Sequence, residues 1–142
     1  MYKYLISTVA CLGLLILVAC GSQGGDASGN SITGVEWQWQ SVTNQTTDET
    51  TTVPNPENYT ITFNEDGTFE GQADCNSIAG SWSQENGFSI TVGPSTLAFC
   101  GEASLDQQYI TLLDSVAAGG PDGAGGLALE TAGGEQRMLF ES

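Results

Sequence analysis

The chain has 142 residues, a length typical of one compact domain, and its 17 acidic residues outnumber two basic ones, for a formal net charge of −15. A chain without a basic patch cannot displace counterions from phosphates, so nucleic acid is excluded as a partner. Histidine is absent, which excludes nucleophiles that need a histidine base and metal sites built on histidine. We therefore expect no cofactor and no metal, and any catalysis would depend on carboxylates, tyrosines, cysteines or Arg137.

The first 20 residues have the pattern of an export signal. Lys3 gives a short positive start, and an apolar run follows from Leu5 to Ala19. This run is shorter than the roughly 20 residues that a membrane-spanning helix needs. The ending Leu17-Val18-Ala19-Cys20 resembles the bacterial lipobox, in which the cysteine receives a diacylglyceryl group and becomes the first residue after cleavage. We expect residues 1–19 to be a lipoprotein signal peptide and Cys20 to carry the lipid; an uncleaved signal anchor is the alternative.

A lipid on Cys20 predicts a location in the cell envelope, on the extracytoplasmic side of a membrane, which would be the outer membrane in a Gram-negative cell. Residues 20–33 would then connect the anchor to the domain. Glycine, serine, aspartate and asparagine dominate this segment, which is typical of a flexible tether. Its r.m.s. span is about 20 Å.

The acidic residues all follow Cys20, and their excess has two interpretations. It keeps the domain soluble, or adapts it to a salty medium in which such charge is screened. Alternatively, it forms a docking surface for a cationic partner. Composition alone does not separate the two.

From residue 34 onward a period of two predicts β-strands. Val35, Trp37 and Trp39 would share the inner face of a first strand. The polar, threonine-rich stretch 43–57 contains two prolines and predicts a long surface loop.

Two hairpins follow in the pattern. The first joins 59–63 to 68–73 by a three-residue loop with a bulge at Gly67, a register that pairs Phe63 with Phe69 and keeps apolar residues on one face. The second joins 80–83 to 88–92 and places Trp82 opposite Ile90. Residues 96–99 form a further short extended segment.

One helix is expected after residue 104, because residues 104–107 match a capping box and five apolar side chains follow on one helical stripe. We expect it to stop at Gly119-Gly120-Pro121. A last hairpin, 127–131 and 135–140, would pair Leu129 with Met138.

Cys75 and Cys100 form an even pair in a domain that is expected to be exported, which predicts a disulfide. A redox pair or a metal site are the alternatives. The chain has no C-x-x-C spacing, and two thiolates without histidine make a poor zinc site.

The segment GQADCNSIAGSW, residues 71–82, resembles the G-x-x-G-C-N-x-x-x-G-x-Y motif of META-domain (HslJ-like) proteins, and TLAFC, residues 96–100, resembles their T-x-M-x-C. Besides the two cysteines, the motif positions are Gly71, Asn76, Gly80, Trp82 and Thr96. Asp74, Trp82 and Ala98 stand where the family has glycine, tyrosine and methionine.

The resemblance implies a mainly β fold over residues 34–142, a small antiparallel β-barrel-like domain with one helix packed on it, which we expect to be a monomer. It also implies a domain without catalytic activity or cofactor, of a family linked to stress tolerance, whose motif residues have structural roles. We therefore expect a non-catalytic, membrane-anchored envelope lipoprotein in envelope maintenance or stress tolerance.

Two other functions stay open at this point. An acidic binding module or inhibitor could capture a cationic protein or peptide at the cell surface. A carboxylate-based enzyme would need two acids across a cleft, and Glu70 and Asp74 are the candidates because they would lie on one strand face.

Overall fold

The computed structural model describes residues 31–142. The expected signal peptide, the lipid site Cys20 and most of the expected tether lie outside the described residues. The strands are β1 (Glu36–Asn44), β2 (Thr50–Thr52), β3 (Tyr59–Phe63), β4 (Thr68–Ala73), β5 (Asn76–Ser83), β6 (Ser89–Val92), β7 (Val116–Pro121), β8 (Leu127–Thr131) and β9 (Gln136–Glu141). The helix is α1 (Asp106–Asp114), and two short 3-10 turns, η1 (Pro56–Asn58) and η2 (Ala132–Gly134), complete the fold.

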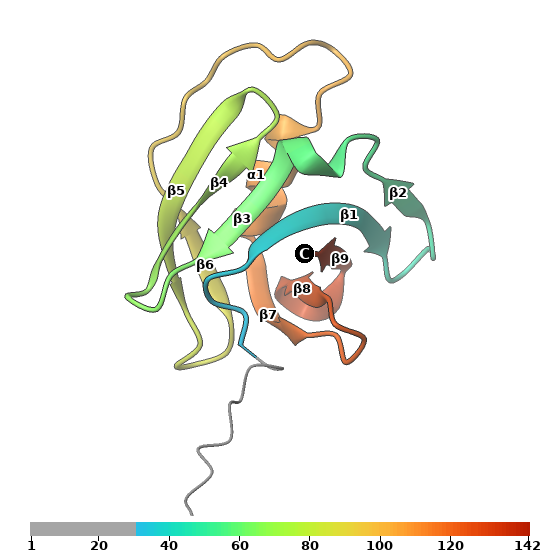
Figure 1. Cartoon of the computed structure of the whole chain (residues 1–142). Helices are drawn as coiled ribbons and strands as arrows, with labels where there is room; N and C mark the ends of the chain where they lie inside the picture. The colour runs from blue at the N-terminus through green and yellow to red at the C-terminus, as the bar shows by residue number, and fades with distance from the viewer. Residues whose placement is uncertain (1–30) are drawn as a thin grey trace, which may run out of the picture.

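The strands form one antiparallel sheet that curls into a nearly closed barrel, as Figure 1 shows. Its order is β6-β5-β4-β3-β1-β9-β8-β7, with β2 paired to β1 outside this path. The terminal strands β6 and β7 approach each other without a ladder between them. Beside this seam, Asp114 of α1 accepts a hydrogen bond from the backbone N–H of Val92 in β6 (3.1 Å). The mainly β, barrel-like fold expected from the sequence is therefore confirmed.

The predicted hairpin registers are also confirmed. Phe63 lies opposite Phe69, Trp82 opposite Ile90, and Leu129 opposite Met138. Gly67 adopts a φ of +83°, the left-handed conformation that a bulged three-residue hairpin loop requires and that glycine adopts at little cost. The alternation of apolar residues determined these registers because a slip by one residue would turn every apolar side chain toward solvent.

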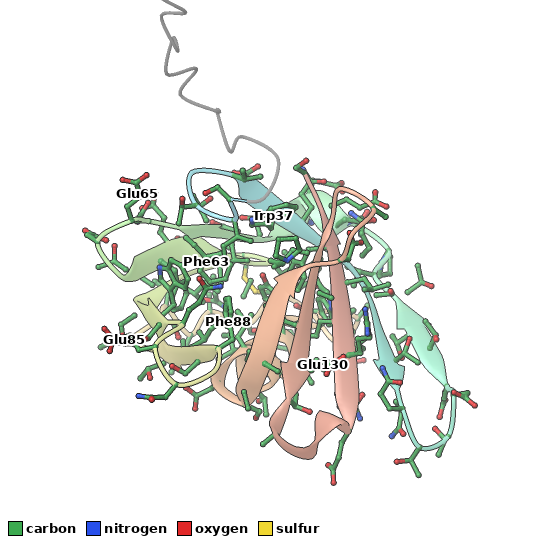
Figure 2. All side chains as sticks on the ribbon, turned by 90° about the horizontal axis from the view of Figure 1, so that it is seen from below. Trp37, Phe63, Glu65, Glu85, Phe88 and Glu130 are labelled. Carbon is green, nitrogen blue, oxygen red and sulfur yellow. A yellow bond between two sulfur atoms is a disulfide. The ribbon has the colours of Figure 1, made fainter. Side chains whose placement is uncertain are left out.

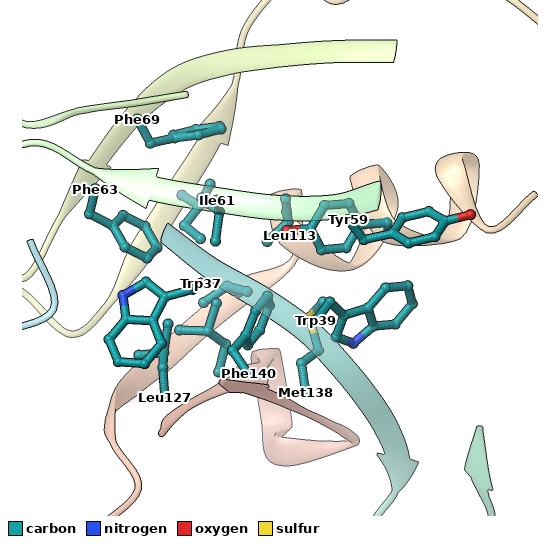
Figure 3. Close-up of a cluster of buried hydrophobic side chains, with 14 of the residues drawn as sticks. Trp37, Trp39, Tyr59, Ile61, Phe63, Phe69, Leu113, Leu127, Met138 and Phe140 are labelled. Atoms are coloured by element: carbon teal, nitrogen blue, oxygen red, sulfur yellow. The ribbon is translucent and has the colours of Figure 1, made fainter. Parts of the chain in front are cut away.

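Aromatic side chains fill the interior of the barrel (Figure 3). The largest fully buried ones are Trp39, Tyr109, Phe63, Phe69 and Phe140. The register of β1 against β9 shifts between Trp39 and Ser41, so that Val42 continues the buried face of this strand. The interior of a small barrel is filled by side chains, and in this barrel the packed aromatic rings supply much of that core.

The prediction of one long surface loop over residues 43–57 is wrong in part. Thr50–Thr52 forms β2 and pairs with β1, with Ser41 opposite Thr52, and Pro56–Asn58 forms η1. The strand β1 extends beyond its pairing with β3, and this free edge gives the β-branched threonines a partner for pairing. The pairing is local, with Thr43 opposite Thr50, but a run of polar residues carries no apolar alternation that would predict a strand.

The predicted end of the helix is also wrong. The helix ends at Asp114, and the residues that follow form β7, in which Gly119 pairs with Leu129. Glycines have low helix propensity, and Gly119 lets β7 approach Phe88, whose ring lies 3.3 Å from where a Cβ would stand. The extended pairing therefore prevails over the apolar stripe.

The capping box forms only in part. The Ser104 hydroxyl accepts a hydrogen bond from the N–H of Asp106 (3.2 Å), while Leu105 occupies the N-cap position. The Gln107 side chain donates to the Asp106 carboxylate (3.2 Å) rather than to the backbone of Ser104. Asp106 is buried at the start of the helix, and a buried carboxylate needs hydrogen-bond donors of this kind.

Candidate functional site

The segment between β6 and α1, residues 93–105, has no regular secondary structure over most of its length; it is called the stapled loop below. A disulfide joins Cys75, in the turn between β4 and β5, to Cys100 in this loop, so the predicted bridge is confirmed. The Thr96 hydroxyl accepts a hydrogen bond from the N–H of Ser77 (3.0 Å). The loop is thus fixed to the beginning of β5 at two points.

Asn76 holds the middle of the stapled loop. Its side chain is fully buried, its Oδ1 accepts from the N–H of Ala98 (2.8 Å), and its Nδ2 donates to the carbonyl of the same residue (3.0 Å). An amide that pairs with both backbone groups of one residue imitates a β-ladder. This explains in physical terms why asparagine occupies the motif position after Cys75.

Asp106 lies beneath the loop at the start of α1. It is 8% exposed, and its Oδ2 accepts from Asn76 Nδ2 (3.1 Å) and from Gln107. Burial pushes the pKa of Asp106 upward, but the hydrogen bonds from Gln107, Ser104 and Asn76 outweigh it and hold the pKa below its ordinary value. Within residues 31–142 the one ion pair joins Arg137 and Glu130, so no described cation neutralises Asp106.

Tyr59 connects the same region to the barrel. Its hydroxyl accepts from the N–H of Leu105 (2.9 Å) and donates to Asp74 (3.3 Å). Asp74 adopts a φ of +56°, a conformation that aspartate tolerates better than most residues. The aspartate therefore occupies the tight turn where the family motif has glycine.

The stapled loop presents two apolar side chains to solvent. Leu97 is 79% exposed and Phe99 is 83% exposed, and they are the only large hydrophobic side chains exposed to this degree within residues 31–142. They flank Ala98, whose backbone Asn76 holds in place. A shallow groove runs from this pair to the start of α1 and is lined by Leu97, Phe99, Gly101, Glu102, Asp106 and Gln107.

The remaining motif residues lie elsewhere in the barrel. A side chain at Gly71 would collide with the carbonyl oxygen of Thr60, and one at Gly80 with that of Thr91. Trp82 is half-buried, donates its indole N–H to the carbonyl of Asn64 (2.9 Å) and packs against Phe63 and Phe88. These positions serve close strand packing, whereas Cys75, Asn76, Thr96 and Cys100 meet at the stapled loop.

The prediction that Glu70 and Asp74 lie on one strand face is wrong. Strand β4 ends at Ala73, and Asp74 lies in the turn beyond it, bonded to Tyr59. Glu70 is exposed on β4. The left-handed backbone at Asp74 breaks the alternation that would have kept the two carboxylates on the same side.

Among residues 31–142, no three acidic or cysteine side chains come together in a way that could hold a metal ion. None of the helices in this part of the chain has the length and apolar character needed to cross a bilayer.

A scan against family models matches the META domain over residues 30–142. The chain belongs to the META domain family. Membership supports a domain of non-enzymatic type. Of the curated proteins, none matches the chain.

Two solved structures share the fold of this META domain. One is the crystal structure of a DUF4847 family protein from Bacteroides vulgatus, with 16% identity and a TM-score of 0.58, covering 78% of this chain and 93% of that one. The other is the NMR structure of a protein from Burkholderia xenovorans, with 17% identity and a TM-score of 0.61, covering 78% and 82%. At these identities the likeness concerns the fold alone.

Sequence reasoning missed three residues of the stapled loop region. Leu97 and Phe99 belonged to an expected extended segment, but alternation does not reveal which segments lack a neighbour to cover them. Asp106 entered the prediction only as an inner position of the capping box at residues 104–107. Its link to Asn76, 30 positions earlier, exists only in the folded chain.

Proposed function

We propose that this protein is a non-catalytic envelope lipoprotein, in which a lipid on Cys20 holds the META domain at the extracytoplasmic side of a membrane. Its role would be envelope maintenance or stress tolerance. The lipobox pattern at residues 17–20 supports the anchor. The observation that carries the non-catalytic part is the role of Asn76, the buried polar residue of the motif. Its side-chain amide forms hydrogen bonds with Ala98 and Asp106, so it stabilises the loop and does not face a substrate.

Mass spectrometry of the protein purified from membranes tests the anchor directly. We expect the mature chain to begin at Cys20 with acyl groups attached, and a Cys20→Ser variant to lack them. A soluble mature chain without acyl groups would contradict the anchor.

A deletion strain challenged with heat and detergent tests the role. We expect wild-type protein to restore tolerance and Cys20→Ser to restore less of it. Glu70→Gln, at the exposed carboxylate that an enzyme would have used, should restore as much as wild type. A deletion strain with full tolerance would exclude the proposed role, and loss of complementation by Glu70→Gln at normal protein level would favour catalysis.

A second candidate function is an acidic binding module for a cationic protein or peptide. The net charge of −15 and the exposure of Leu97 and Phe99 favour it. The two functions are compatible, because an anchored domain can bind a partner.

A further inference from the structure

Exposed large apolar side chains that lie next to each other usually mark an interaction site. Leu97 and Phe99 lie two positions apart, and both line the groove that leads to the start of α1. The disulfide and Asn76 keep this stretch in one conformation. A preorganised apolar pair loses little entropy when a partner covers it.

The groove beside the pair adds negative charge to the apolar contact. Glu102 is exposed at its rim, and the buried Asp106 is among the residues that line it. The two basic residues of the whole chain are Lys3 and Arg137, and Arg137 is paired with Glu130 in β8. Within residues 31–142 no unpaired basic side chain is therefore available to this groove, and a partner can supply the cation.

We propose that the groove between the Leu97–Phe99 pair and the start of α1 binds a basic polypeptide segment in which a lysine or arginine adjoins an apolar side chain. The apolar side chain covers Phe99 and Leu97. The basic side chain follows the groove toward Glu102 and Asp106, and its methylene stem packs along the apolar wall. This inference specifies the binding-module form of the proposed function and does not depend on the lipid.

Charge argues against two other occupants. A second copy of this chain carries the same net charge of −15 and would bring acidic residues against acidic residues. Anionic lipid headgroups would be repelled in the same way. A basic polypeptide is the occupant that matches both the apolar pair and its acidic rim.

The site also lies at the end of the barrel away from the expected tether. The start of the described chain lies beside the end of β3, where the N–H of Gly34 donates to the carbonyl of Phe63 (2.9 Å). The stapled loop lies near Tyr59, at the beginning of the same strand. Figure 1 shows the two at opposite ends of the barrel. A tethered domain can therefore turn this site away from the membrane.

Three labelled 12-residue peptides test the proposal: alternating lysine–leucine, alternating lysine–serine of equal charge, and alternating serine–leucine. The chain is used as isolated from cells, in nanodiscs of zwitterionic lipid if it carries acyl groups and in buffer if it does not. Fluorescence anisotropy measures binding. We expect the lysine–leucine peptide to bind at least about tenfold more tightly than either control, because it alone supplies both parts of the contact.

Variants locate the contact. Phe99→Ser and Leu97→Ser change exposed side chains, so thermal unfolding should match wild type while the lysine–leucine peptide loses at least about tenfold in affinity. Glu102→Gln should weaken binding by a smaller factor that shrinks at high salt. Its matched control is Glu85→Gln, in the turn between β5 and β6 (Figure 2), which should bind like wild type.

Equal binding of the peptide by wild type and Phe99→Ser would overturn the proposal, and so would equal losses in Glu102→Gln and Glu85→Gln, since both would indicate unspecific attraction by net charge. Sedimentation velocity and vesicle flotation test the other occupants. Self-association, or binding to vesicles of anionic or zwitterionic lipid, that Phe99→Ser abolishes would also overturn it. The mass spectrum of the N-terminus decides the anchor separately, so the two failures are distinguishable.

Discussion

The two ends of the barrel are stabilised by different means. At the end that contains Phe63, aromatic rings pack together: the ring centroid of Phe63 lies 5.0 Å from that of Trp82 and 5.6 Å from that of Phe88. The indole N–H groups of Trp37 and Trp82 donate to nearby backbone carbonyls. At the opposite end, Tyr59 also packs against Trp39 and Tyr109, but the loop itself is held by a disulfide and by the buried polar groups of Asn76 and Asp106.

The difference teaches how an exposed apolar surface can be kept in place. The aromatic end hides its apolar groups, and this burial is itself the stabilising force. The disulfide end places polar groups inside and leaves Leu97 and Phe99 outside. Because the loop buries little apolar surface of its own apart from Leu105, covalent and hydrogen-bond constraints replace the missing hydrophobic stabilisation.

Among the variants that test this comparison, removal of the disulfide should have the largest effect on the free energy of unfolding. The chain-entropy model gives about 3.5 kcal/mol for a closed loop of 25 residues, so Cys75→Ala with Cys100→Ala should lower the free energy of unfolding by about that amount. Urea denaturation of the purified protein measures it. Trp82→Phe, which removes an indole hydrogen bond at the aromatic end, should cost about 1 kcal/mol. A larger loss in Trp82→Phe than in the double variant would reverse the comparison.

Asp106→Asn should have an intermediate effect that depends on pH. Because the pKa of Asp106 is lowered in the folded protein, its ionised form stabilises the fold above the ordinary value of 3.8, and this contribution is lost as pH falls through the lowered pKa. At neutral pH we expect the variant to lose about 1–3 kcal/mol, since the buried donors lose a charged acceptor.

Urea denaturation from pH 7 to pH 2.5 measures this dependence. The difference between wild type and Asp106→Asn should shrink below about pH 4. Gln107→Ala, which removes one donor to the carboxylate, should show a smaller loss with the same direction in pH. A difference that stays constant over the whole range would mean that the charge of Asp106 does not stabilise the loop.

The smallest stability changes are expected for two neighbouring tyrosines, Tyr59 and Tyr109, whose ring centroids lie 5.8 Å apart. The Tyr59 hydroxyl has partners in Leu105 and Asp74, whereas the fully buried Tyr109 hydroxyl has no hydrogen-bond partner among residues 31–142. Burial raises the pKa of Tyr109 well above its ordinary value. Tyr59→Phe should lose about 1 kcal/mol, and Tyr109→Phe should be neutral or more stable by up to about 1 kcal/mol. Equal losses in thermal and urea unfolding would show that Tyr109 has a partner after all.

Local alternation predicted the hairpins because every second residue of a half-buried strand points to the core and is apolar. Phe63 faces Phe69, and Trp82 faces Ile90, as expected. The motif around Cys75 and Asn76 also indicated the family and the disulfide. By contrast, the apolar stripe after residue 105 overestimated the helix, since pairing with β8 extended residues 116–121 instead.

The sequence by itself determined the hairpin registers, because these follow from periodicity over short distances. It also predicted the bridge between Cys75 and Cys100 from an even pair of cysteines, and the barrel-like fold from the resemblance to the META-domain family. Only the tertiary structure decided that Asn76 joins Ala98 to Asp106 and that Leu97 and Phe99 stay uncovered. Exposure depends on which segments pack over a residue, and a hydrogen bond across 30 positions depends on where the folded chain places both partners. Neither quantity has a local signature in the sequence.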